Sequence, residues 1–450
     1  MGANTPRGLL RVLGTGFGIA AVIGSVIGVG ILRVPAALAG DLNQPILFIG
    51  IWLVGAMVAA LGANCVAELA VMLPKAGGPY VYIQRAYGDY PGFLMGWVDW
   101  FISVASAAYI LVAVGEYGLQ LAPAFPGGGN AISLCVIVLL FLIHATGLRS
   151  GSESQKLLSG AKALAFLSLI VVCLVGGLSV EATPEPRQAI VQPPSWALLL
   201  VLGRSAIMVN ETFAGWNTPV YLTEENRRPE RSIPRALFGG IAIVAAIYVL
   251  MNLALLSVLP LEAIAQSKLP LADATALILG DAAGVVVTVL AVVTLMSLCH
   301  ANLFQAPRIL FALSRDGWFH SAASAVTSKG ALLPGLAITA GAMIALAMTG
   351  TFEELFISIA LLGTALDAFT FSAVMRLRKT EPNLPRPYRA KGYPWLPLAV
   401  IAYSVVIIAA AAWAEPSSMV RGGLALLASV PAYFWLRSKR KRVSAEPAAS

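Results

Sequence analysis

Residues 24–35 read GSVIGVGILRVP and residues 210–219 read NETFAGWNTP, and these two stretches decide the fold that we predict. Each interrupts an apolar run with glycine, proline and polar or charged residues. Glycine lowers helix stability and proline removes a backbone donor, so both stretches favour a broken helix. In lipid, freed backbone groups are tolerated only where they line a cavity or are buried in protein. Taken alone, the first stretch equally suits close helix packing through small residues. The second stretch shifts the balance towards breaks at a binding site.

The composition predicts an integral membrane protein. The chain has 450 residues, of which 58% are hydrophobic and 12% charged. A soluble protein carries about 25% charged residues, so this chain has too little polar surface to face water on all sides. The net charge of +8 does not indicate nucleic acid, because basic residues collect in the cytoplasmic loops of membrane proteins. The four cysteines lie in apolar runs without zinc spacing, so we expect no metal site.

Apolar runs of about 20 residues predict twelve transmembrane helices. We place them at 14–38, 45–73, 92–121, 131–148, 155–180, 197–222, 233–259, 282–312, 333–350, 354–377, 394–414 and 420–437. A short surface helix is expected from Tyr80 to Tyr90. With the N-terminus inside, 24 of the 30 lysines and arginines fall in cytoplasmic segments and three in outer loops. This asymmetry predicts that both termini are cytoplasmic.

The two interruptions fall in the first and the sixth predicted helix. That spacing is expected when five helices are repeated with inverted topology, each repeat beginning with a broken helix. The predicted organisation is a cytoplasmic N-terminus (1–13), two repeats (14–180 and 197–377), two further helices (394–437) and a basic, disordered cytoplasmic tail (438–450). Paired interruptions of this kind indicate a transporter binding site.

The termini of broken helices suit a zwitterionic substrate. The half-helix beyond Gly28 offers unpaired N–H groups and partial positive charge to a carboxylate. The half-helix that ends near Ala214 offers unpaired carbonyls to an ammonium group. The residues therefore favour a zwitterionic substrate.

Several motifs resemble those of the amino acid–polyamine–organocation permeases, which have the leucine-transporter fold, and are most similar to their L-type amino acid transporter branch. The motifs are Ile27-Gly28-Val29-Gly30-Ile31, Ala67-Glu68-Leu69, Gly77-Gly78-Pro79-Tyr80, Gly215-Trp216-Asn217, Thr223-Glu224-Glu225, Arg231-Ser232-Ile233-Pro234, and Arg308 with Ser314-Arg315-Asp316-Gly317. The resemblance covers the first ten predicted helices and implies an all-α fold of two inverted five-helix repeats plus two C-terminal helices.

The resemblance also implies a substrate site. The N–H groups of Val29 and Gly30 would hold the substrate carboxylate, and the carbonyls of Val26, Glu211 and Ala214 would hold its amine. Many relatives have serine where Val29 stands, and L-type relatives have an aromatic gate where Glu211 stands, a role that Phe213 would take here. The loop at 123–130 has no cysteine, so no disulfide-linked glycoprotein partner is expected.

Lys162 lies in the fifth predicted helix, where a charge is costly. One interpretation is a lysine that reaches the cytoplasmic interface. The resemblance implies another: the ammonium of sodium-independent relatives occupies the sodium position and braces the first helix against the eighth, near Ser297. Bracing with proton coupling and bracing without it both remain open.

Arg33 follows the first break, and the resemblance implies an outer gate that closes by an ion pair. Glu211 is the first candidate partner and Asp367 the second. The structural alternative is a pair between Arg204 and Glu211, which share a helix face. We interpret His300 as a buried hydrogen-bonding group rather than a proton carrier, and both Glu68 and Asp99 as structural.

The predicted function is sodium-independent secondary transport of amino acids across the plasma membrane, by exchange or proton symport. The alternatives are an amino acid sensor that does not transport and a polyamine or organocation exchanger. The three histidines are dispersed, so we expect neither catalytic residues nor metal, and no phosphate-binding loop indicates an ATP-driven pump. No cofactor is expected. The expected partners are the amino acid, the lipid bilayer and, in symport, protons.

Overall fold

The fold is described from a computed structural model, for residues 8–28, 30–179, 195–280, 282–348, 352–414 and 426–438 except 428 and 432. Within these residues the secondary structure is helical, apart from one isolated parallel bridge between Leu13 and Asn226.

The first expected break is present. Helix α1 (Thr15–Val26) and helix α2 (Gly30–Leu42) are bent by 51° relative to each other. Ile27 ends α1 with extended backbone angles, φ −69° and ψ 107°. The short connection frees the last carbonyls of α1 and the first N–H groups of α2 from helical bonding. Val29, which we expected to bind the carboxylate, lies outside the described residues.

The second expected break is also present. Helix α8 (Ser195–Thr212) ends before the Gly215-Trp216-Asn217 motif, and a 3₁₀ helix, η1 (Thr218–Glu225), follows it. Gly215 has φ +96°, a conformation that L side chains rarely adopt. Its glycine therefore lets the chain turn between the two helical pieces.

The other long helices overlap the predicted spans. They are α3 (Pro45–Met72), α5 (Asp89–Leu121), α6 (Gly128–Ala145), α7 (Leu148–Gly177), α9 (Pro229–Val258), α12 (Ala282–Arg315), α13 (Leu333–Met348), α14 (Phe352–Thr380) and α15 (Trp395–Ala414). The expected surface helix is α4 (Pro79–Tyr87). Of the predicted twelfth span, only residues 426–427, 429–431 and 433–437 are described, and these are helical.

Three short helices were not predicted: α10 (Leu261–Gln266), α11 (Pro270–Leu279) and the 3₁₀ helix η2 (Ser321–Ser324). Among the described residues, six helices are long and apolar enough to cross a membrane, and the bent pair α1/α2 makes a seventh. The chain is thus a multi-pass membrane protein, while the count of twelve spans and the inverted repeat stay predictions.

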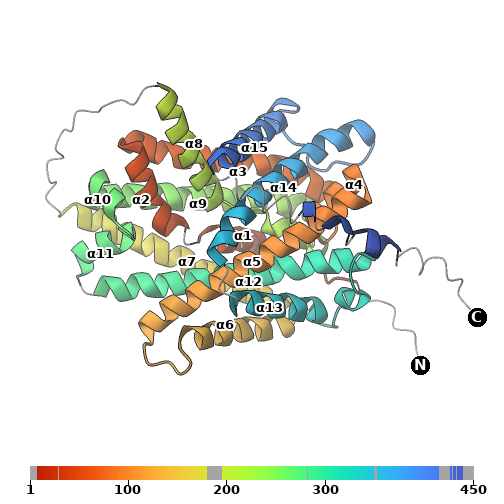
Figure 1. Ribbon diagram of the computed structural model, residues 1–450, viewed down its shortest axis with the longest axis horizontal. Coiled ribbons are helices and arrows are strands. Elements are labelled where there is room, and N and C mark those ends of the chain that lie inside the picture. The colour runs from red at the N-terminus through yellow and green to blue at the C-terminus, as the bar shows by residue number, and fades with distance from the viewer. Residues whose placement is uncertain are drawn as a thin grey trace, which may run out of the picture.

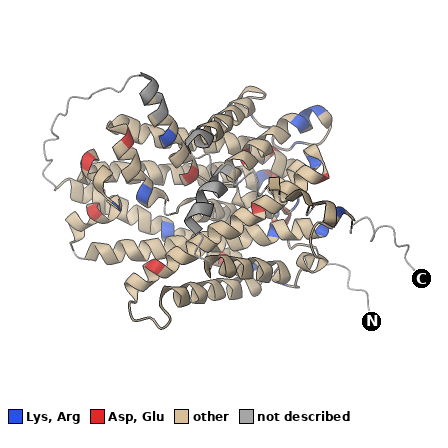
Figure 2. Ribbon diagram, viewed as in Figure 1, with Lys and Arg blue, Asp and Glu red and all other residues tan. Residues whose placement is uncertain are grey.

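The helices pack as a bundle around α1 (Figure 1). Helix α1 contacts α7, α9 and α12, and α5 runs along α12. Helices α2 and α10 lie at one end of the bundle, and α4 lies at the other. Lysines and arginines gather mainly at the end with α4 (Figure 2). This distribution agrees with the predicted orientation, in which the α4 end is cytoplasmic.

Candidate substrate cavity

A cavity of about 1020 Å³ lies between the two helix breaks. Its wall includes Ser25, Val26, Gly28 and Gly30 from the first break, and residues 210–218 from the second. Helices α3, α5, α12, α14 and α15 also contribute to the wall. Cavities that bind small molecules commonly measure about 300–1,000 Å³, so this volume is sufficient for an amino acid.

The two breaks contact each other directly. The Ser25 hydroxyl lies 2.7 Å from the Gly215 carbonyl oxygen and 2.6 Å from the Ala21 carbonyl oxygen. A Cβ atom added to Gly215 would lie 2.8 Å from the Ser25 carbonyl oxygen. Any other residue at position 215 would therefore push the two broken segments apart.

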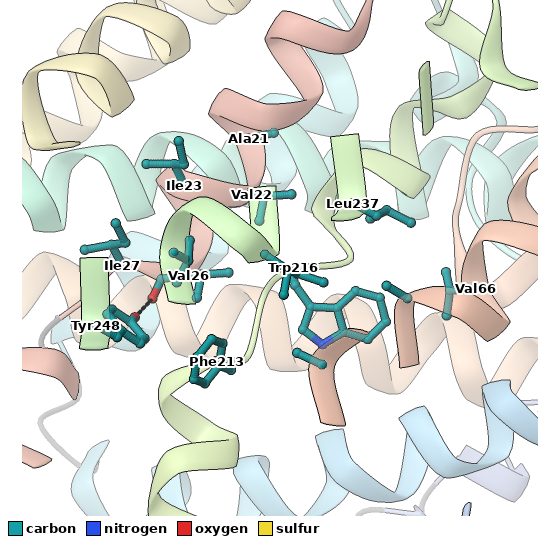
Figure 3. Close-up of a cluster of buried hydrophobic side chains, with 14 of the residues drawn as sticks. Ala21, Val22, Ile23, Val26, Ile27, Val66, Phe213, Trp216, Leu237 and Tyr248 are labelled. Carbon is teal, nitrogen blue, oxygen red and sulfur yellow. Dashed lines mark hydrogen bonds between the residues drawn. The ribbon is translucent and has the colours of Figure 1, made fainter. Parts of the chain in front are cut away.

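Tyr248 joins the free ends of the two broken helices. Its hydroxyl lies 3.0 Å from the carbonyl oxygen of Val26, in the last residue of α1, and 3.0 Å from that of Thr212, in the last residue of α8. The ring is held edge-on between Trp52 and Phe213, at centroid distances of 5.3 and 5.0 Å. Figure 3 shows the Tyr248–Val26 hydrogen bond beside Phe213. The sequence analysis did not identify Tyr248 as a site residue. The one indication in the sequence is a hydroxyl group in the middle of an apolar run.

Lys162 reaches the broken end of α1 from α7. Its ammonium donates to the carbonyl oxygens of Gly24, at 2.9 Å, and Ile27, at 2.7 Å. The side chain is fully buried, so it does not extend to the membrane interface. Gly24 lets α7 approach this closely, because an added Cβ would lie 1.9 Å from Gln155 Nε2. The Ser297 hydroxyl is buried and makes no hydrogen bond within the described part of the chain.

Gly30, the first residue of α2, faces the end of α8. An added Cβ would lie 3.0 Å from Thr212 Cγ2 and 3.1 Å from Thr212 Oγ1. The N-terminal end of α2, with its unpaired N–H groups, therefore packs closely against the end of α8, with no space for a side chain larger than that of glycine.

The other expected site residues share the same cavity wall. Glu211 and Ala214 line it, and so does Phe213, which is buried against Tyr248. The Val26 carbonyl, expected to bind the amine, already accepts the Tyr248 hydroxyl, which leaves one lone pair for a ligand.

Charged side chains also line the cavity. Arg33 and Arg204 are exposed, and Asp367 joins Glu211 on the wall. Arg33 donates to the Tyr117 hydroxyl at 3.3 Å, and Arg204 lies 3.6 Å from Asp41. No ion pair joins either arginine to Glu211 or Asp367 in the described residues, so the gate pair expected with bound substrate stays a prediction.

Asp99, which we interpreted as structural, lines the cavity as well. It lies on α5 and accepts the Tyr221 hydroxyl at 2.8 Å. The Ser103 hydroxyl donates to the Asp99 backbone carbonyl at 2.9 Å, and Gln305 donates to Ser103 at 3.1 Å and accepts from Thr218 at 3.3 Å. The sequence could have indicated the place of Asp99 in the cavity, because Ser103 follows it one turn later on the same helix face.

His300 lies outside the cavity wall. Its Nε2 atom is 2.7 Å from the Ser154 hydroxyl, while its Nδ1 atom is buried without a partner among the described residues. The ring packs 4.4 Å from that of His144. The structure therefore places a hydrogen-bonded histidine here and does not test the proton role.

Two buried ion-pair clusters lie towards the α4 end. Arg308 binds Glu225 through two hydrogen bonds of 3.2 and 3.0 Å. Glu68, at the end of α3, accepts from Arg378, Arg386 and the backbone N–H of Ala390 at 2.5–3.2 Å. These contacts fasten the connection between α14 and α15 to α3.

Comparisons with known proteins agree with this geometry. The family described as "Amino acid permease" matches residues 18–434. The chain is 27% identical to the serine/threonine exchanger SteT of Bacillus subtilis, over 96% of this chain and 98% of that protein. It is 27% identical to human Asc-type amino acid transporter 1, over 98% and 86% of the two chains. It is 26% identical to the human large neutral amino acids transporter small subunit 2, over 92% and 78%.

Proposed function

This chain belongs to the amino acid permease family, and from that premise we propose that it exchanges amino acids across the plasma membrane without sodium. Amino acid transport follows from the family and from transporters that match nearly the whole chain. Exchange is supported by the name of the bacterial relative, a serine/threonine exchanger. The alternating-access cycle would move two inverted five-helix repeats around the cavity, with both termini in the cytoplasm.

One observation carries the independence from sodium. The Lys162 ammonium donates to two carbonyl oxygens at the broken end of α1. Unpaired carbonyls at a broken helix are also the ligands that bind sodium in transporters. A fixed ammonium supplies the positive charge that these carbonyls need, so the break requires no metal ion.

The substrate would lie between the two breaks. The N–H groups at the start of α2, Gly30 among them, would bind its carboxylate, with Val29 as a further donor. The carbonyls of Val26, Glu211 and Ala214 would bind its amine. Arg33 would close the cavity from outside by pairing with Glu211 or Asp367.

A reconstituted system tests this proposal. Purified protein in liposomes is preloaded with unlabelled amino acids, and uptake of radiolabelled ones is followed with sodium or choline outside. We expect equal rates in the two media and faster uptake into preloaded vesicles than into empty ones. A drop of about tenfold in choline, more than 1 kcal/mol of lost coupling, would contradict sodium independence. If a pH gradient drives uptake into empty vesicles as fast as into preloaded ones, the protein is a proton symporter and not an exchanger.

A further inference from the structure

Three carboxylates face the proposed substrate cavity: Asp99 from α5, Glu211 from α8 and Asp367 from α14. The Thr364 hydroxyl lies 3.4 Å from Glu211 Oε1, and Thr364 is one helical turn before Asp367 on α14. Glu211 and Asp367 therefore share one wall. Asp367 is also close enough to both Glu211 and Asp99 for their like charges to repel each other.

These three carboxylates lack a cationic partner among the described residues, unlike the buried acids Glu68 and Glu225. Glu68 binds Arg378 and Arg386, and Glu225 binds Arg308. The two arginines on the cavity wall are held elsewhere, Arg204 beside Asp41 and Arg33 on the Tyr117 hydroxyl. The cavity wall therefore carries more negative than positive charge, and its positive charges lie apart from its carboxylates.

Uncompensated carboxylates at membrane depth are costly, and such residues mark substrate or ion pathways. Arg33, on closing the outer gate, would neutralise only one of the three. A cation that enters the cavity from solution can compensate the remaining carboxylates. A substrate ammonium or guanidinium group supplies that charge and removes the cost of burying the acid.

The position of Glu211 indicates that the substrate carries this ammonium or guanidinium group on its side chain. Glu211 is the last residue but one of α8, and its own carbonyl and that of Ala214, three residues further on, are among those proposed to bind the α-amine. Its carboxylate and that of Asp367 line the same cavity as those carbonyls. The cavity volume of about 1020 Å³ is large enough for an amino acid with a long side chain.

Building on the proposed function, we infer that the cavity selects amino acids with a second positive charge, such as lysine and arginine. The side-chain cation lies beside Asp367, the carboxylate left unpaired when Arg33 closes on Glu211, while the α-carboxylate lies at the start of α2. This selectivity separates the chain from relatives whose names specify serine, threonine or neutral amino acids.

Competition in proteoliposomes tests the wild-type protein. Uptake of radiolabelled serine is measured against unlabelled lysine, arginine, leucine and putrescine. We expect lysine and arginine to inhibit at concentrations about tenfold lower than leucine, as an added charge-assisted bond implies. Putrescine has two cations but no carboxylate, so it should inhibit poorly.

Two results overturn the selectivity. In one, labelled serine is carried and lysine does not compete better than leucine. In the other, putrescine competes as well as lysine, which would mean that the α-carboxylate of the substrate does not contribute to binding. Failure of every amino acid to exchange is distinguishable from both, because it overturns the proposed function itself.

A variant locates the selectivity. Asp367→Asn should lower the ratio of lysine uptake to serine uptake about tenfold, since one charge-assisted contact is lost. Glu262→Gln removes a carboxylate from the exposed surface of α10 and should leave that ratio unchanged. Equal losses for lysine and serine in Asp367→Asn would mean that this carboxylate does not read the side chain. If Asp367→Asn fails to fold, the wild-type competition still decides.

Discussion

At the scale of single residues, Lys162 makes the strongest prediction. Lys162→Met keeps most of the side-chain volume and removes the donor to Gly24 and Ile27. Each buried carbonyl left unpaired costs about 1–3 kcal/mol, so exchange should fall at least about tenfold. Lys156→Met is the matched control on α7, because the Lys156 side chain is 40% exposed and pairs with the exposed Glu153.

The two variants are compared by amino acid exchange in proteoliposomes, at equal amounts of protein in the membrane. Comparable rates for Lys162→Met and Lys156→Met would show that the broken end of α1 keeps its shape without the ammonium.

Gly30 makes a second prediction at this scale. Gly30→Val should abolish substrate binding, because its branched side chain would cover the N–H end of α2 and press on Thr212. Adding Thr212→Ala relieves the contact with α8 but not the cover over the N–H groups, so binding should stay lost. Gly50→Val on α3 is the control, since an added Cβ meets nothing within 4 Å there.

Binding of a radiolabelled amino acid to the detergent-solubilised protein distinguishes these effects. If the Gly30→Val/Thr212→Ala double variant binds the amino acid again, the loss in Gly30→Val comes from packing against α8. The substrate carboxylate would then not bind at the start of α2.

At the scale of helices, Tyr248 connects the two broken elements. Tyr248→Phe keeps the ring between Trp52 and Phe213 and removes only the hydroxyl shared by α1 and α8. Losing this buried donor should cost about 1–3 kcal/mol and slow exchange by about tenfold or more. Tyr403→Phe removes a hydroxyl with a weaker contact, 3.4 Å from the Ala206 carbonyl oxygen, and should change the rate little. Exchange rates measured side by side in liposomes check this, and equal rates would deny Tyr248 a role in positioning.

A second prediction for helices concerns the connection between α14 and α15. Glu68→Gln should leave Arg378 and Arg386 without a buried counter-charge and destabilise the fold by about 3–5 kcal/mol. Glu381→Gln breaks the partly exposed pair with Arg85, worth less than about 1 kcal/mol. Thermal unfolding in detergent should therefore separate the two variants clearly. An unchanged unfolding temperature for Glu68→Gln would mean that this cluster does not hold α15 to α3.

Both breaks could be predicted from the sequence because glycine, proline and polar residues are rare inside apolar runs. The contacts between the breaks could not. Tyr248 looks like an ordinary aromatic residue in a spanning helix, and only the folded chain shows two carbonyls within 3.0 Å of its hydroxyl. Asp99 lies near the cytoplasmic end of its predicted helix, which favours a structural role, and its depth relative to the cavity depends on how α5 crosses α12. The short helices α10 and α11 were missed because they are too short for an apolar run of spanning length.

At the scale of the whole molecule, the distribution of basic residues predicts the orientation. In a Cys135→Ser background, which removes the one exposed cysteine of the described chain, Ala124→Cys and Ser328→Cys each add one exposed thiol. A membrane-impermeant maleimide should label Ala124→Cys in intact cells, and Ser328→Cys only after the membrane is permeabilised. The reverse pattern would invert the topology, and labelling of both in intact cells would mean that one span is miscounted.

The ammonium at the break of α1 also has an electrical consequence. A bound ion enters from one side and leaves on the other, and membrane voltage acts on its passage. The Lys162 ammonium stays attached to α7, so it adds nothing to the charge carried across in a complete cycle. Any current therefore reports the exchanged substrates alone. Serine against leucine should be electrically silent, whereas lysine against leucine should move one elementary charge per turnover.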